Sequence, residues 1–252
     1  MSDRLSAEEQ NYYVAIKGKM LRRFGMAAGI QREVLTHRFD ERTVRRWMAR
    51  ASKDLEALIP QIPYIGGGEN EFTRYLLYPA GILPLARVMR YEGVPLRAIG
   101  RTIFDVSAVA YSAIPAPVRW WMGRSYFTEK RKARWCETAA RSQERRYAGD
   151  WVCEFVEGDG ETFVYGLNMA ECGLLKFWRA QGLEELVPYL CLTDYALWRA
   201  IGVEVRRTQT LANGGSCCDY RYVGRGKDGP SGWPPEPLPE WTGKYESPLP
   251  SD

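Results

Sequence analysis

The side chains best able to do chemistry gather between residues 191 and 222. Cys191, Asp194, Tyr195 and Trp198 follow one another at helical spacing, so they share one face of an expected helix. Burying a carboxylate in such an apolar and aromatic stripe is costly unless it has a partner or a chemical role. Asp194 is therefore a candidate acid or base. The alternative is that it only bonds a neighbouring backbone group.

A second reactive group lies on a segment that alternates like a β-strand. Alternate side chains of a strand point to opposite faces, which separates Cys218, Tyr220 and Tyr222 from Cys217, Asp219 and Arg221. One of the two adjacent thiols is then expected in the core and the other elsewhere. Neighbouring cysteines alone are weak support for catalysis, because a free cysteine is more often a small buried hydrophobic residue than a nucleophile.

The elements that must position these groups belong to an antiparallel sheet with helices. Two strand-like segments flank the turn Gly158-Asp159-Gly160, which is a hairpin pattern. The expected order is strands at 151–157 and 162–167, helices at 171–180 and 183–201, a strand at 203–210, a turn at 213–215 and a returning strand at 217–223.

The first half of the chain is expected to be helical. Ser6 and Glu9 have capping-box spacing, which predicts a helix to about Arg23 that Gly25 can end. A second helix is expected from 41 to 59, stopped by Pro60, because its apolar residues fall on one face. An irregular loop at 62–70, buried helices at 72–114 and a charged helix at 128–147 complete this half.

The fold class expected from these elements is α+β. A mainly helical region at 1–150 and an α+β region at 151–223 are interpreted as one continuous domain. The segment 224–252 is rich in proline and glycine and has no periodicity, which predicts an extended arm or a disordered tail.

Three segments of the C-terminal half resemble the signature of the L-2-amino-thiazoline-4-carboxylic acid hydrolase family. They read CLTDY at 191–195, TQTLANGG at 208–215 and CCDYRY at 217–222. The loop PYIGG at 63–67, with Asn70, is also similar to that family. The resemblance spans about residues 10–223, and Tyr220 departs from it, since phenylalanine is the usual residue there.

This resemblance implies hydrolytic opening of a five-membered ring at an amidine-like carbon, which gives a carbamoyl amino acid. Such chemistry needs a thiolate or an activated water, an acid for the departing atom, and donors for a substrate carboxylate. Cys218 is the first choice of nucleophile and Cys191 the second, with Asp194 or Asp219 as the acid or base. The expected substrate-binding residues are Tyr64, Gly66, Gly67, Asn70, Gln209 and Arg221.

Other functions remain open at this point. The element order of the C-terminal half also resembles the vinyl-reductase-type (V4R) ligand-binding domains, which would bind an effector or a metal without catalysis. Cys172, Cys191 and Cys218 are conceivable zinc ligands, but no CxxC or HxxxH spacing occurs, so neither a metal nor a cofactor is expected. The single histidine, His37, is expected at the surface. A purely structural interaction protein is the third alternative.

Composition and net charge limit the kinds of binding partner that are expected. Hydrophobic residues make up 45% and charged residues 26% of the 252 residues, which is ordinary for a globular protein. A net charge of +4 is too small for the dense basic field of a nucleic-acid-binding protein. No apolar run reaches membrane-spanning length and no signal peptide is evident, so a cytoplasmic protein with reduced cysteines and no membrane partner is expected. The expected partner is a small carboxylate-bearing molecule, and the tail leaves a homo-oligomer open.

Overall fold

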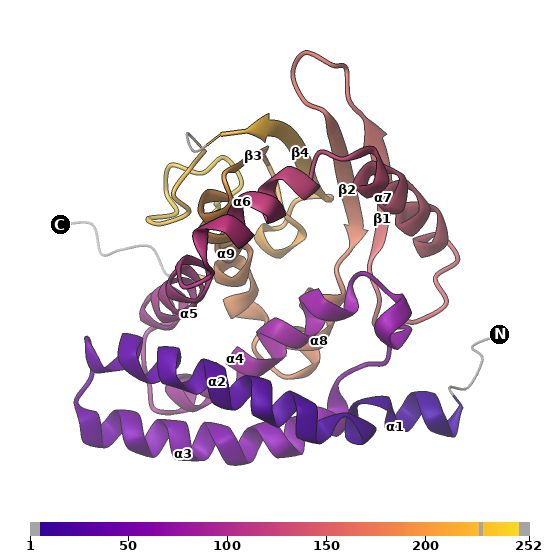
Figure 1. Cartoon of the computed structure of the whole chain (residues 1–252). Helices are drawn as coiled ribbons and strands as arrows, with labels where there is room; N and C mark the ends of the chain where they lie inside the picture. Colours follow the sequence, from indigo (N-terminus) through magenta and orange to yellow (C-terminus); the bar gives the residue numbers. More distant parts are fainter. Residues whose placement is uncertain (1–5, 227–228, 247–252) are drawn as a thin grey trace.

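The first half of the chain is built from helices (Figure 1). The computed structural model describes residues 6–226 and 229–246. The helices are α1 (Ala7–Ala15), α2 (Lys17–Thr36), α3 (Glu41–Leu58), α4 (Thr73–Tyr91), α5 (Leu96–Ser112), α6 (Ala116–Ser125) and α7 (Glu129–Ser142), with short 3-10 turns η1 (Ile59–Gln61) and η2 (Gly67–Glu69). Within the described residues, no helix combines the length and the apolar character needed to cross a membrane.

The capping box expected at the start of the first helix is present, but the helix is shorter than expected. The Ser6 hydroxyl accepts a hydrogen bond from the Glu9 amide at 3.2 Å, and the Glu9 carboxylate accepts one from the Ser6 amide at 2.9 Å. However, α1 ends before Ile16, and α2 then continues through Gly25 to Thr36. The expectation that Gly25 ends the helix was wrong, because packing of the α2 face against α3 and α5 outweighs the helix-weakening effect of one glycine.

The second half contains the antiparallel sheet, so the α+β prediction is confirmed. The strands lie in the order β1-β2-β4-β3, and β1 and β2 form the expected hairpin, although the second strand covers Tyr165–Glu171 rather than 162–167. The V4R likeness stays a prediction. The elements are β1 (Val152–Glu157), β2 (Tyr165–Glu171), α8 (Gly173–Ala180), η3 (Glu184–Leu186), α9 (Val187–Ile201), β3 (Val203–Arg206), η4 (Leu211–Asn213) and β4 (Cys218–Arg225).

One face of the sheet belongs to the core. Tyr165, Leu167 and Tyr222 are buried on that face, where α7 packs along β1 and α9 along β3. The same hydrophobic cluster extends without a break into α3, α4 and α5. The alternate residues of β4, including Asp219 and Arg221, point to the opposite, more polar face.

The tail crosses the outside of α5 and α9. Residues 229–246 contain no helix or strand, yet Leu238 is only 4% exposed and Glu240 only 2%. The Trp233 ring lies 6.0 Å from Phe104 and 6.3 Å from Tyr189, measured between centroids. The tail therefore adds buried groups, including one carboxylate, to the core around α9.

Candidate active site

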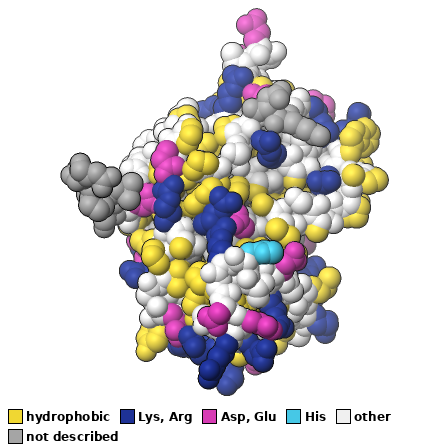
Figure 2. All heavy atoms as spheres, turned by 90° about the vertical axis from the view of Figure 1, so that its left-hand side faces the viewer, with side chains coloured by type: hydrophobic (Ala, Val, Ile, Leu, Met, Phe, Trp, Pro, Cys, Tyr) yellow, Lys and Arg dark blue, Asp and Glu magenta, His cyan; other side chains and the backbone are white. Residues whose placement is uncertain are grey.

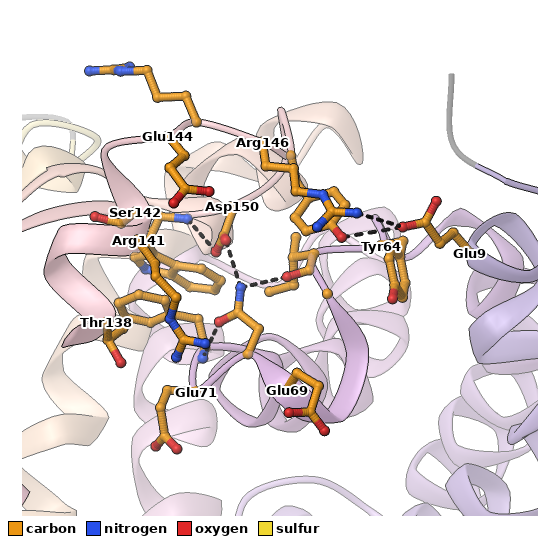
Figure 3. Close-up of a pocket in the computed structure, with 17 residues that line it drawn as sticks. Glu9, Tyr64, Glu69, Glu71, Thr138, Arg141, Ser142, Glu144, Arg146 and Asp150 are labelled. Atoms are coloured by element: carbon orange, nitrogen blue, oxygen red, sulfur yellow. Dashed lines mark hydrogen bonds and ion pairs between the residues drawn. The ribbon is translucent and has the colours of Figure 1, made fainter. Parts of the chain in front are cut away.

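A pocket of about 340 Å³ lies between the loop before α4 and the end of α7 (Figure 3). We call it the Asp150 pocket, and its volume is in the range of sites for small molecules. It is lined by residue 9, residues 64–66, 69–72, 138, 141, 142, 144–147, 150 and 151. Three of the expected substrate-binding residues, Tyr64, Gly66 and Asn70, are among them.

Glycines shape the loop that carries Asn70. Gly66 has φ +104° and Gly67 has φ +57°, a left-handed conformation that other residues rarely adopt. A Cβ atom on Gly67 would also lie 2.9 Å from the Tyr12 ring. The two glycines therefore allow the tight turn that directs the Asn70 side chain toward Asp150.

Asp150 is the acid at the centre of the pocket. The Asn70 amide nitrogen donates to Asp150 Oδ2 at 2.6 Å and to the Ile65 carbonyl at 2.5 Å. The Trp151 backbone amide donates to Asp150 Oδ1 at 2.7 Å. Burial raises the pKa of Asp150, while these hydrogen bonds and the charge of Lys176 act in the opposite direction. A carboxyl with a raised pKa in a pocket is suited to proton transfer.

Three arginines, Arg141 in the last turn of α7 and Arg145 and Arg146 just after it, line the same pocket. Arg145 pairs with Glu171, and Arg146 lies 3.7 Å from Glu9. Arg145 also has φ +50°, a strained value for a residue other than glycine. Arg141 makes no ion pair or hydrogen bond with any residue in the described part of the chain. Its guanidinium is thus available to an anionic ligand.

A second group of reactive side chains surrounds the buried Arg207; we call Arg207, Asp194, Tyr220, Glu240 and Cys191 the Arg207 cluster. The Arg207 side chain is 0% exposed. It donates to Asp194 Oδ2 and Glu240 Oε1, both at 2.9 Å, to the Tyr220 hydroxyl at 3.2 Å and to the Cys191 carbonyl at 3.0 Å. Aromatic rings enclose its guanidinium. One buried cation therefore anchors two carboxylates.

Asp194 is the partly open member of the Arg207 cluster. Its side chain is 34% exposed, and Oδ2 also accepts a hydrogen bond from the Tyr220 hydroxyl at 3.3 Å. Burial raises the pKa of Asp194, and the charge of Arg207 opposes that rise. Asp194 is thus a second carboxyl with the properties of an acid or base.

The thiols expected as nucleophiles lie beside this cluster. Cys218 is 5% exposed, and its sulfur accepts a hydrogen bond from the Leu211 amide at 3.3 Å. Burial raises the pKa of Cys218 to about 12 and raises that of Cys191 well above its ordinary value. At neutral pH Cys218 is therefore held almost entirely as the protonated thiol. Both thiols are therefore poor nucleophiles in this conformation.

Thiol reactivity provides a direct check of this environment. With a small aromatic disulfide reagent, exposed Cys136 is expected to react fastest in the native protein, and Cys218 and buried Cys153 at least about 100-fold more slowly, because thiolate and access are both required. Mass mapping of the modified peptides measures this order. A Cys136→Ser variant is the control, since it should lose the fast phase alone. Fast modification of Cys218 would contradict the description of its surroundings.

The remaining predicted residues lie elsewhere. Both Asp219 oxygens accept hydrogen bonds from the start of the next loop, from Thr208 and from the Gln209 amide. Arg221 donates to Asn168 at 2.9 Å on the same polar face of the sheet. Gly67 contacts Tyr12 rather than the Asp150 pocket.

The predicted residues thus form three separate groups. Tyr64, Gly66 and Asn70 line the Asp150 pocket. Asp194 and Cys191 belong to the Arg207 cluster, with Cys218 next to it. Asp219, Gln209 and Arg221 are engaged on the opposite face of the sheet. The predicted roles of these residues stay predictions.

Sequence reasoning missed Asp150, Arg141 and Arg207. Asp150 follows Gly149 at the junction between a helix and a strand. An acidic residue at that junction is the sequence signal that could have pointed to Asp150. Alternation was the available signal for Arg207, since it places Arg207 on the same side as the buried Val203 and Val205, and Arg206 on the other. His37 is exposed, on the face of the molecule that Figure 2 shows. Among the described residues, no group of three or more His, Cys, Asp or Glu side chains has an arrangement that could hold a metal ion.

Part of the chain matches a known protein family. Residues 122–222 match the family model of L-2-amino-thiazoline-4-carboxylic acid hydrolase. The matched segment runs from α6 to β4, so the predicted resemblance is confirmed there. The hydrolase match contains Arg141 and Asp150 as well as Cys191, Asp194 and Cys218, whereas the loop with Asn70 lies outside it. No curated protein and no solved structure matches the chain significantly.

Proposed function

We propose that this protein is a hydrolase that opens a small cyclic amidine or amide bearing a carboxylate, and that the reaction takes place in the Asp150 pocket. The name of the matched family supports a thiazoline carboxylate as the kind of substrate. The observation that carries the proposal is that Asp150, whose pKa is raised, and Arg141, which has no partner among the described residues, line the same small pocket.

The proposed reaction uses each of these groups once. Arg141 binds the substrate carboxylate by charge-assisted hydrogen bonds and thereby places the ring. Ionised Asp150 takes a proton from a water molecule, whose oxygen forms a bond to the amidine-like carbon. The bond from that carbon to the ring sulfur or nitrogen breaks, and the departing atom receives a proton from Asp150. The net change is the addition of one water.

Asn70 is a positioning residue in this scheme. Its amide donates to Asp150 Oδ2 and to the Ile65 carbonyl, which fixes the direction of the carboxylate. The backbone turn at Gly66 and Gly67 holds Asn70 in this position. This arrangement gives the loop that resembled the hydrolase family a role through Asp150, without direct contact with the reacting atoms.

The Arg207 cluster is the second candidate for the reaction centre. Its support is the partly exposed Asp194, held by a cation that is itself 0% exposed. In this version Asp194 activates the water, or Cys218 loses its proton to Asp194 and forms a bond to the amidine-like carbon. In the second case the ring bond breaks, the departing atom takes the proton from Asp194, and water then hydrolyses the covalent intermediate. The high pKa of Cys218 favours the activated water.

The deciding experiment is product analysis by mass spectrometry on a panel of thiazoline carboxylates, hydantoins and cyclic amides. The wild type is expected to add one water to at least one thiazoline carboxylate. Asp150→Asn, Asp194→Asn and Cys218→Ser variants, each with its fold verified by circular dichroism, then locate the centre. Activity lost only in Asp194→Asn or Cys218→Ser would move it to the Arg207 cluster. A wild type that binds such rings without opening them would favour the V4R-like binding function.

Arg141→Met tests the carboxylate contact. We expect KM to rise about 10- to 100-fold with little change in kcat, because one charge-assisted hydrogen-bond pair to the substrate is lost. Steady-state kinetics measures both constants. Lys130→Met is the matched control, since Lys130 is an exposed cation of the same helix that does not line the pocket. An unchanged KM in Arg141→Met would remove Arg141 from the proposed site.

A further inference from the structure

A second and larger cavity lies between α2 and α4, with one end closed by α5. We call it the α2–α4 groove; its volume is about 460 Å³. Its walls are largely apolar, formed by side chains such as Phe24, Ile30, Leu77 and Ile82. Of the residues in the proposed mechanism, Gly67 and Asn70 border it, whereas Asp150 and Arg141 do not. The groove is therefore distinct from the place where the proposed reaction occurs.

Two cations that line the groove, Lys19 and Arg23, have no partner among the described residues. Lys19 and Arg23 line the groove one helical turn apart on α2. Both are exposed, and neither makes an ion pair or hydrogen bond with a described residue. Glu71, the acid that borders the groove, is already paired with Arg74, Arg131 and Arg134. This end of the groove thus carries uncompensated positive charge and suits an anionic head group.

The side of the groove that faces α5 contains a largely buried amide with no partner in the described part of the chain. Gln31 is 7% exposed and makes no hydrogen bond with the described residues. It borders the groove beside Val106 and Ala110 of α5. A buried polar group in native proteins nearly always has a hydrogen-bond partner. The Gln31 amide is not enclosed by protein atoms and borders the groove, so it is free to bond a ligand oxygen there.

The distance between Lys19 and Gln31 along α2 indicates how long a ligand that contacts both would be. Lys19 and Gln31 are twelve residues apart in one helix, which is about 18 Å along its axis. Gly81 lets the Phe24 ring of α2 pack directly on α4, because a Cβ atom there would lie 2.1 Å from that ring, and this contact narrows the groove. A narrow apolar channel of this length fits an extended alkyl chain better than a compact ring.

We propose that the α2–α4 groove binds a medium-chain carboxylic acid that carries an oxygen at its far end. The carboxylate pairs with Lys19 and Arg23, the alkyl chain lies along Phe24, Leu77 and Ile82, and the far oxygen bonds to the Gln31 amide. The proposal is independent of the hydrolase function, since it concerns other residues and a non-covalent complex.

Isothermal titration of the full chain with ω-hydroxydodecanoate, below its micelle-forming concentration, tests this site. The wild type is expected to bind it saturably, and to bind plain dodecanoate about fivefold more weakly because one neutral hydrogen bond is missing. The Gln31→Leu variant should lose this preference while it still binds dodecanoate. Equal affinity of the wild type for the two acids would overturn the role of Gln31.

Charge and shape variants complete the test. Joint replacement of Lys19 and Arg23 by Glu should weaken binding about tenfold or more, since two favourable charge contacts become repulsive. Arg22→Glu should leave binding unchanged, because Arg22 is an exposed α2 residue outside the groove. Ala27→Trp should block binding by filling the channel. Unimpaired binding by a folded Ala27→Trp protein, or no saturable binding by the wild type, would overturn the proposal. Self-association abolished by Ala27→Trp, with neither acid bound, would instead assign the groove to a second copy of the chain.

Discussion

Replacing Asp150 by Asn is expected to lower kcat/KM for ring opening by about 10³-fold, within the range usual for loss of a general acid–base group. The amide keeps the size of the carboxyl and one acceptor for its hydrogen bonds, but it cannot take a proton from water. The loss should fall mainly on kcat, because the substrate carboxylate is bound by Arg141. Steady-state kinetics of the folded variant provides the measurement.

The pH profile distinguishes a catalytic Asp150 from a structural one. Asp150 must be ionised to accept a proton, and burial raises its pKa above the ordinary 3.8. Activity of the wild type should therefore fall as the pH is lowered through a range above that of a free carboxyl. The residual activity of Asp150→Asn should lack this acidic limb. Asp194→Asn is the matched control, since it alters the other carboxyl with a raised pKa. Wild-type activity in Asp150→Asn would refute the proposed site.

Replacing Arg207 by Met is expected to destabilise the fold by about 3–5 kcal/mol, the usual result of removing one partner of a buried ion pair. The side chains of Arg207 and Glu240 are both 0% exposed. Glu240 Oε1 accepts hydrogen bonds from Arg207 and from the Tyr195 hydroxyl, whereas Oε2 has no partner among the described residues. Without Arg207, the Glu240 charge would remain in the core uncompensated. Chemical denaturation followed by fluorescence measures the change.

Two comparisons make this stability result specific. Arg206→Met should change stability by less than about 0.5 kcal/mol, because Arg206 pairs with Glu204 in an exposed position. Adding Glu240→Gln to Arg207→Met should recover part of the loss, since it removes the buried unpaired charge. The deficit should also be smaller at acidic pH, where Asp194, whose pKa burial raises, becomes neutral. A cost for Arg207→Met equal to that of Arg206→Met would show that the buried pair contributes little.

The local elements of this fold could be predicted because local signals and packing agree on them. The Ser6 capping box, the helix that Pro60 stops and the hairpin around Gly158-Asp159-Gly160 all occur in the structure. Where a local sequence signal and tertiary packing disagree, packing determines the structure. Gly25 is compatible with a helix end, but the contacts of α2 extend past it, so the helix does as well.

For the candidate site, the types of residue could be predicted from the sequence, but their surroundings could not. Periodicity correctly placed Cys191 and Asp194 on one helix and Cys218 on a strand, and all three lie close to Arg207. It gave no means of knowing that burial would raise the pKa of both thiols. It also could not show that Asp219 would be occupied by hydrogen bonds to Thr208 and Gln209.

By itself, the sequence determined the α+β class, the turn that Gly66 and Gly67 permit and the resemblance confirmed over residues 122–222, since each depends on residues close together in the chain. The tertiary structure alone decided which distant groups meet. Asn70 and Asp150 are eighty residues apart in sequence and 2.6 Å apart in space, and Glu240 reaches Arg207 from the tail. Such pairs depend on how the helices and the sheet pack together, because burial and the proximity of charges are properties of the assembled core.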